Sequence, residues 1–137
     1  MRRLIIALFA VIGLTGPAAA DPIAIGGYDA VSYQNGAPVA GSPAYSLDWR
    51  GRSWQFASAD TKAEFQADPE RYAPEFGGHC AYAASRGYIA AGDPEIYRLV
   101  DGKLYLQFSR RALELWEEDV PGNIAKGEAN WPKIRPN

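Results

Sequence analysis

The chain has 137 residues, of which 47% are hydrophobic and 22% are charged, and its 14 basic and 16 acidic side chains give a formal net charge of −2 at pH 7. This composition is typical of a globular protein and excludes a disordered or fibrous chain. The arginines form pairs, such as Arg50 with Arg52, rather than the basic clusters that bind nucleic acid, so we expect no nucleic-acid partner.

The N-terminus has the three parts of a secretory signal peptide. The basic residues Arg2 and Arg3 precede an apolar run over residues 4–14, and three alanines at 18–20 form a small-residue cleavage site. The apolar run is shorter than the roughly 20 residues of a membrane-spanning helix, and no later segment approaches that length. We therefore predict a signal peptide over residues 1–20, a single domain over 21–137, and a periplasmic or secreted protein without a membrane span.

The predicted elements begin with a loop over residues 21–43 that contains a short helical turn. Aromatic and polar residues then alternate over 45–49 and 53–56, which predicts a β-hairpin with one aromatic face around the turn at 50–52. Ser58 is a typical helix-capping residue and predicts a helix over residues 59–67. That helix ends at the Asp-Pro pair before a second short turn.

An alanine-rich segment follows two glycines and predicts a short helix with Cys80 in its first turn and Gly87 at its C-terminal end. Asp101-Gly102 predicts a second hairpin. In its second strand Leu104, Leu106 and Phe108 share one face.

Ser109 caps the next predicted helix, which carries Leu113, Trp116 and Val120 at helical spacing and is broken by Pro121-Gly122. A last helical piece runs to the Asn-Trp-Pro stop at 130–132. The order of elements predicts an α+β fold with a small antiparallel sheet of about four strands and short helices on one side. We detect no internal repeat in the sequence.

Cys80 and His79, the only cysteine and histidine after the signal peptide, are adjacent and form the leading candidate site. A thiol at a helix N-terminus is favoured as the thiolate, which is a nucleophile and a soft-metal ligand. Thiolate and imidazole together suit copper, and copper(I) has low coordination demands. A closed metal site would need further donors, for which Asp29, Asp93 or the same pair in a second chain are the candidates.

Three alternatives stay open for Cys80. It can be buried as a small hydrophobic residue on the same helical face as Ala84, leaving a structural or protein-interaction module with His79 at the surface or bonded to the glycine loop. It can act as a thiol redox residue, although no resolving cysteine is present. It can also link two copies in a homodimer through an intermolecular disulfide, or the module can bind another exported protein through its aromatic surface. The sequence has none of the common hydrolase, phosphate-loop or zinc-protease motifs, so we do not expect an enzyme.

Six short motifs, in order along the chain, resemble those of exported bacterial YHS-domain proteins. They are Tyr-Asp-Ala-Val-Ser-Tyr at 28–33, Trp-x-Phe-x-Ser at 54–58, Phe-x-x-Asp-Pro-x-x-Tyr at 65–72, Gly-Gly-His-Cys-Ala at 77–81, Asp-Gly-Lys-Leu-Tyr at 101–105 and Asn-Trp-Pro at 130–132. The resemblance covers nearly all of the chain after the signal peptide. It implies a small α+β module from a family associated with heavy-metal handling, copper in particular.

The resemblance does not carry over the family's metal ligands. The metal-associated branch has cysteines at positions where this chain has Ser32, Ala57 and Thr61. Cys80 is the one soft ligand that remains. The sequence-level hypothesis is therefore an exported binding module that handles copper, or another soft metal, through Cys80 with His79.

Overall fold

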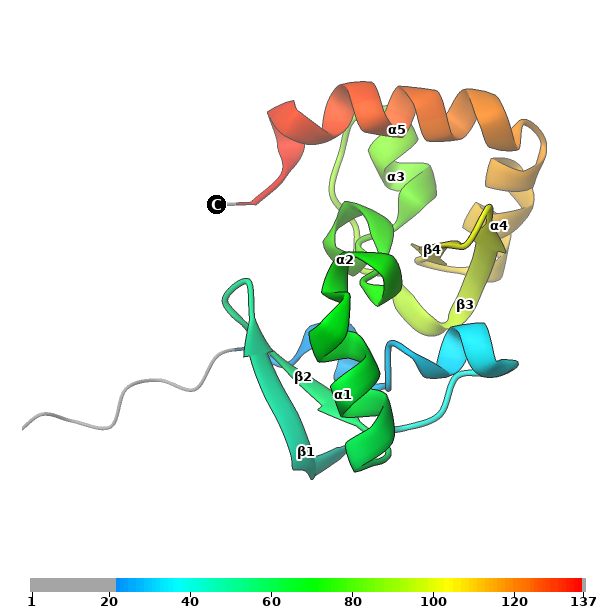
Figure 1. Cartoon of the computed structure of the whole chain (residues 1–137). Helices are drawn as coiled ribbons and strands as arrows, with labels where there is room; N and C mark the ends of the chain where they lie inside the picture. Colours follow the sequence, from blue (N-terminus) through cyan, green and yellow to red (C-terminus); the bar gives the residue numbers. More distant parts are fainter. Residues whose placement is uncertain (1–21, 137) are drawn as a thin grey trace, which may run out of the picture.

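A computed structural model of the chain describes residues 22–136 (Figure 1). The predicted signal peptide lies outside these residues. Six elements make up the first half: η1 (Ala24–Gly27), η2 (Ser32–Asn35), β1 (Ser42–Trp49), β2 (Arg52–Phe56), α1 (Ala59–Ala67) and α2 (Pro69–Tyr72). The second half consists of η3 (Glu75–Gly78), α3 (Ala81–Arg86), β3 (Asp93–Val100), β4 (Lys103–Gln107), α4 (Arg110–Glu117) and α5 (Val120–Ile134).

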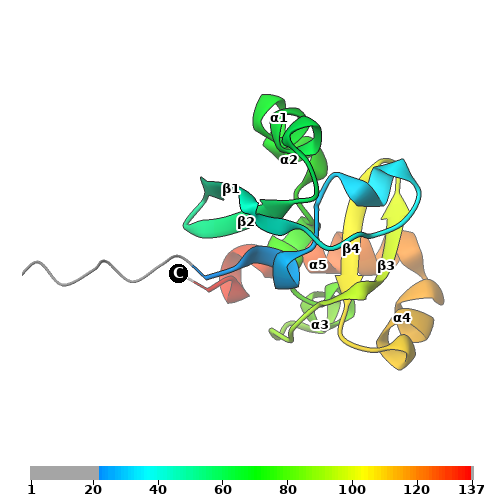
Figure 2. The same cartoon turned by 90° about the horizontal axis from the view of Figure 1, so that it is seen from below.

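The predicted α+β class is confirmed, and its four antiparallel strands divide into two separate two-stranded sheets, β1–β2 and β3–β4. Each sheet is a hairpin with helices of its own: α1 contacts β1 and β2, while α3 and α4 contact β4. Figure 2 shows the two groups from below, with α1 and α2 beside the first hairpin and α3 to α5 beside the second. Within residues 22–136, no helix has the length and apolar character needed to cross a membrane.

The second half repeats the first, and the expectation that the chain holds no repeat is therefore wrong. A spacing of 51 residues relates Gly26 to Gly77 and Ser58 to Ser109. The strands follow the same spacing and pair in the same register, with a bulge at the same place in each hairpin. A short bridge before each hairpin is repeated too, Tyr28 with Ala40 and His79 with Ala91.

The backbone angles support the repeat residue by residue. Ile25 has a φ of 43° and its counterpart Phe76 a φ of 54°, a left-handed conformation that bulky side chains rarely adopt. The helix caps Ser58 and Ser109 have φ values of −151° and −152°. Such agreement at unusual positions indicates that both halves use one folding unit, despite different side chains at most equivalent sites.

The turns of both hairpins also match. Arg50-Gly51 has φ values of 49° and 70°, and Asp101-Gly102 has φ values of 51° and 77°. Two consecutive positive φ angles define the type I′ turn, whose twist suits a two-residue hairpin. Only the second turn has the Asp-Gly sequence that favours this type strongly.

Strand β4 joins the two hydrophobic cores. Leu104 and Leu106 pack in the core of the first half, around Phe56 and Phe65. Tyr105, which points to the opposite face of the strand, packs in the second core against Trp116. Because one strand contributes to both cores, the two halves are packed against each other.

Three sequence-based details are corrected by the structure. Phe108 is 60% exposed instead of continuing the face of Leu104 and Leu106, because β4 ends one residue earlier. Val120 begins α5 rather than ending the preceding helix, since a proline in the first turn leaves no helical hydrogen bond broken. Cys80 is the N-cap of α3 and precedes its first turn.

Candidate functional site

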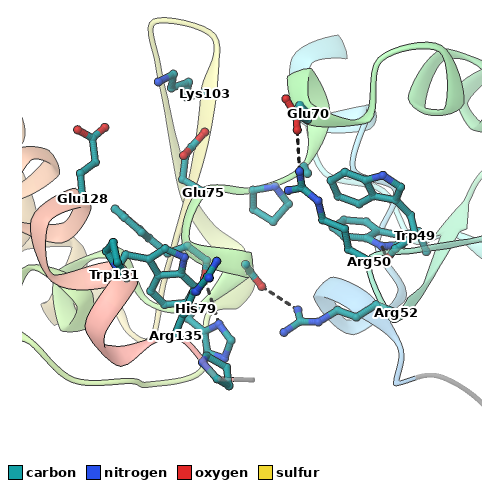
Figure 3. A pocket seen from close by; sticks show the side chains of 17 residues that line it. Trp49, Arg50, Arg52, Glu70, Glu75, His79, Lys103, Glu128, Trp131 and Arg135 are labelled. Atoms are coloured by element: carbon teal, nitrogen blue, oxygen red, sulfur yellow. Dashed lines mark hydrogen bonds and ion pairs between the residues drawn. The ribbon is translucent and has the colours of Figure 1, made fainter.

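A pocket of about 680 Å³ lies where the two halves meet. One wall comes from the β1–β2 turn and carries Trp49, Arg50 and Arg52. The opposite wall carries His79, which follows η3, and Trp131 of α5. Figure 3 shows the two walls facing each other across the open space. Neither half could form this pocket alone.

The wall on the β1–β2 side is ordered by contacts of its two arginines. The Arg50 guanidinium lies 4.3 Å from the centre of the Trp49 ring and forms an ion pair of 2.6 Å with Glu70. Arg52 reaches across the pocket, and its Nη1 donates a 2.7 Å hydrogen bond to the Gly77 carbonyl (Figure 3). Arg52 therefore connects the two walls while its remaining N–H groups stay available for a ligand.

The opposite wall is aromatic. The His79 ring lies 5.6 Å from the Trp131 ring, centre to centre, and Trp131 in turn packs edge-on against Phe76. His79 Nδ1 is 3.0 Å from the Phe76 carbonyl oxygen. Because a carbonyl can only accept, Nδ1 holds a proton, and in the neutral ring Nε2 is the nitrogen left with a lone pair.

The end of the pocket that contains Glu75, Lys103 and Glu128 is acidic. Burial raises the pKa of Glu75 above its usual range, the charge of Lys103 lowers it, and the charge of Glu128 raises it again. All three side chains line the pocket, and Figure 3 shows them away from Arg52. A carboxyl group with a raised pKa is protonated more readily, so Glu75 loses its negative charge at a higher pH than an ordinary glutamate does.

Cys80 is adjacent to His79 in sequence but lies in a different environment. Its side chain is buried, with 2% exposure, in a cluster with Ala83, Ala112, Ala90 and Tyr82. The sulfur is 3.4 Å from Gln107 Oε1 and accepts a 3.5 Å hydrogen bond from the Ala83 N–H. The thiol thus has polar contacts, yet it is not a surface group.

The two aspartates that were predicted as further metal donors, Asp29 and Asp93, accept hydrogen bonds from backbone N–H groups. Asp29 is fully buried, and its carboxylate accepts hydrogen bonds of 2.9 and 3.0 Å from the N–H groups of Val31 and Ala57. Asp93 accepts from the Glu95 N–H at 2.9 Å at the start of β3. Over residues 22–136, no three His, Cys, Asp or Glu side chains come together as a metal site.

The repeat explains why Cys80 sits where it does. Cys80 is the counterpart of Asp29, and Tyr82 is the counterpart of Val31. In the second half the Tyr82 N–H is bound by Gln107 Oε1 at 3.0 Å, so Gln107 has taken over the bond that the Asp29 carboxylate makes in the first half. The Gln107 Nε2 has no hydrogen-bond partner in the part of the chain described here.

Sequence reasoning identified His79 and missed the other residues of the pocket. Arg52 was assigned only to a hairpin turn and Trp131 only to a helix stop. The signal that could have found them is the repeat, because a duplicated unit creates an interface between its copies. The spacing of the Gly-Gly pairs and capping serines carries that signal.

Comparisons with known proteins add no further constraint. No protein-family model, no curated protein and no solved structure matches the chain. The resemblance to exported YHS-domain proteins accordingly stays a prediction from the sequence motifs.

Proposed function

We propose that this protein is a binding module that takes a small ligand in the pocket between its two halves. The observation that carries the proposal is the composition of the walls. Aromatic rings of Trp49, Trp131 and His79 provide flat contact surfaces, and guanidinium groups provide directed hydrogen-bond donors. Small-molecule sites are concave, of about 300–1,000 Å³, and combine apolar walls with a few polar groups.

The side chains of the walls are held by contacts within the protein, which suggests that the site is largely formed before a ligand binds. Trp131 is held by Phe76 and His79, His79 by the Phe76 carbonyl, and Arg52 by the Gly77 carbonyl. Side chains fixed in this way lose little conformational entropy on binding. The residues that make these contacts all line the pocket themselves.

The proposal is tested by screening a set of small aromatic acids, amines, amides and sugars against the protein without its signal peptide, using titration calorimetry. We expect at least one class to bind, and we expect Trp131→Ala to weaken that binding about tenfold, because the ligand loses an aromatic contact surface. Tyr88→Ala, which removes an exposed aromatic residue that does not line the pocket, is the matched control. Binding that is unaffected by Trp131→Ala, or no binding by any class, would reject the pocket as the site.

Soft-metal binding through Cys80 with His79 is retained as a second proposal. The observation that favours it is the Nδ1 bond of His79, which leaves Nε2 as the nitrogen that could coordinate a metal. The metal role, the thiol redox role and the disulfide alternative all need the sulfur of Cys80, which is 2% exposed, to become reachable. Further donor atoms for the metal would come from a small molecule bound in the pocket or from a second chain.

A copper(I) titration under anaerobic conditions tests this second proposal. The wild-type protein is expected to show a tight site that Cys80→Ala removes and His79→Ala weakens, since the thiolate is the stronger soft ligand. Urea denaturation of each variant confirms that it is folded. Equal copper(I) binding by the wild type and Cys80→Ala would discard the proposal.

A further inference from the structure

One end of the pocket carries positive charge that no carboxylate of residues 22–136 pairs with. Of its arginines, Arg50 is paired with Glu70, whereas Arg52 and Arg135 form no ion pair with any carboxylate in residues 22–136. Arg52 spends one N–H on the Gly77 carbonyl, which is neutral and leaves the charge in place. Figure 3 shows Arg52 on one wall and Arg135 beside His79 on the other.

The acidic groups of the pocket do not neutralise this end. Glu70 is taken up by Arg50, and Glu75 and Glu128 lie toward Lys103, away from Arg52 (Figure 3). Burial also raises the pKa of Glu75, which disfavours its charged form. Two guanidinium groups that have no carboxylate partner among residues 22–136 suit an anion, because each can donate two parallel hydrogen bonds to a carboxylate or phosphate.

The surface next to the two arginines is largely aromatic. It is formed by the rings of Trp131 and His79, which pack against each other, and by Pro132. An aromatic ring of a ligand would find offset or edge contacts there. The positive charge and the aromatic surface together favour a ligand that has both an anionic group and a planar ring.

Building on the proposed function, we propose that the pocket takes a small organic anion with a planar ring. Its carboxylate would lie between Arg52 and Arg135, and its ring against Trp131. His79 would border both parts, with its Nε2 facing the ligand as a further polar group. The anion is recognised by charge and the ring by shape, so neither part alone should bind well.

The test uses three probes that share one ring: 4-hydroxyphenylacetate, its uncharged amide 4-hydroxyphenylacetamide, and the cation tyramine. We expect the carboxylate to bind at least about tenfold more tightly than either of the other two. Arg135→Gln and Arg52→Gln should each weaken carboxylate binding about tenfold without changing amide binding. Arg98→Gln, which lies outside the pocket and pairs with Glu117, is the control and should change nothing.

Using two arginine variants separates the loss of a ligand contact from a loss of folding. Arg135 is exposed and directly follows α5, so its replacement leaves the packed core intact, whereas Arg52 also bonds the Gly77 carbonyl. Amide or tyramine binding as tight as that of the carboxylate, dependent on Trp131, would overturn the anion assignment while leaving a ligand pocket. Carboxylate binding that both arginine variants retain in full would overturn it as well, as would no binding by the carboxylate.

Discussion

Asp29→Ala is expected to lower the free energy of unfolding by about 3–5 kcal/mol, one of the two largest effects that we anticipate. The Asp29 carboxylate is fully buried and is the acceptor for two backbone N–H groups, those of Val31 and Ala57. Alanine would leave both donors buried without a partner, and each such loss costs about 1–3 kcal/mol. It would also remove the link between the segment at residues 29–31 and Ala57, which directly follows β2. Urea denaturation followed by tryptophan fluorescence measures the change.

Two further variants make this test specific. Asp29→Asn keeps one acceptor oxygen and should lose less stability than Asp29→Ala. Asp48→Ala replaces an exposed aspartate of β1 and should change the free energy of unfolding by less than about 0.5 kcal/mol. If Asp29→Ala were as stable as Asp48→Ala, the buried carboxylate would not organise the first half.

Gly92→Ala is the second large effect, and we expect a loss of more than about 3 kcal/mol or a failure to fold. A Cβ at this position would collide with the Gly78 carbonyl oxygen and lie 2.8 Å from the Leu106 Cβ. The Gly78 backbone cannot give way easily, because it belongs to the turn that precedes His79. At Gly41, the counterpart in the first half, a Cβ would lie 2.5 Å from the Gln55 backbone, and Gly41→Ala should also be strongly destabilising.

Gly102→Ala separates steric contact from backbone conformation. Gly102 has a positive φ of 77°, but a Cβ there would meet no atom within 4 Å. Its replacement should cost only about 1–2 kcal/mol, the strain of a left-handed alanine. Circular dichroism and urea denaturation of the three variants compare them directly. A Gly92→Ala protein as stable as Gly102→Ala would show that the close approach of the two loops is not required.

The parts of the fold that were predicted correctly have local signals. The capping serines Ser58 and Ser109 mark the starts of α1 and α4, and the Asp101-Gly102 turn marks the second hairpin. Helix α5 was underestimated because Pro121 interrupts a helix only in its interior, whereas here it stands in the first turn. Local patterns therefore located most elements but misplaced the end of β4 and the starts of α3 and α5.

The repeat and the pocket were not predictable in the same way. Most equivalent positions hold residues of different chemistry, such as Asp29 and Cys80, so the sequence similarity is limited mainly to a few glycines, a proline and the capping serines at a spacing of 51 residues. The pocket depends on how the two copies pack, which brings Arg52 to the Gly77 carbonyl. The burial of Cys80 followed from the same tertiary contacts. No local pattern distinguishes a capping thiol from a reactive one.

The central claim, a ligand site between the two halves, is tested most directly by a ¹H–¹⁵N NMR titration with 4-hydroxyphenylacetate. Saturable shifts are predicted for the Trp131 indole N–H, for the backbone of Gly77 and His79, and for the Arg52 side chain, because these groups line the pocket. A second hollow, lined by residues 91–94 and Phe108, should show none. Shifts confined to that second hollow, or no saturable shifts in the pocket, would contradict the account.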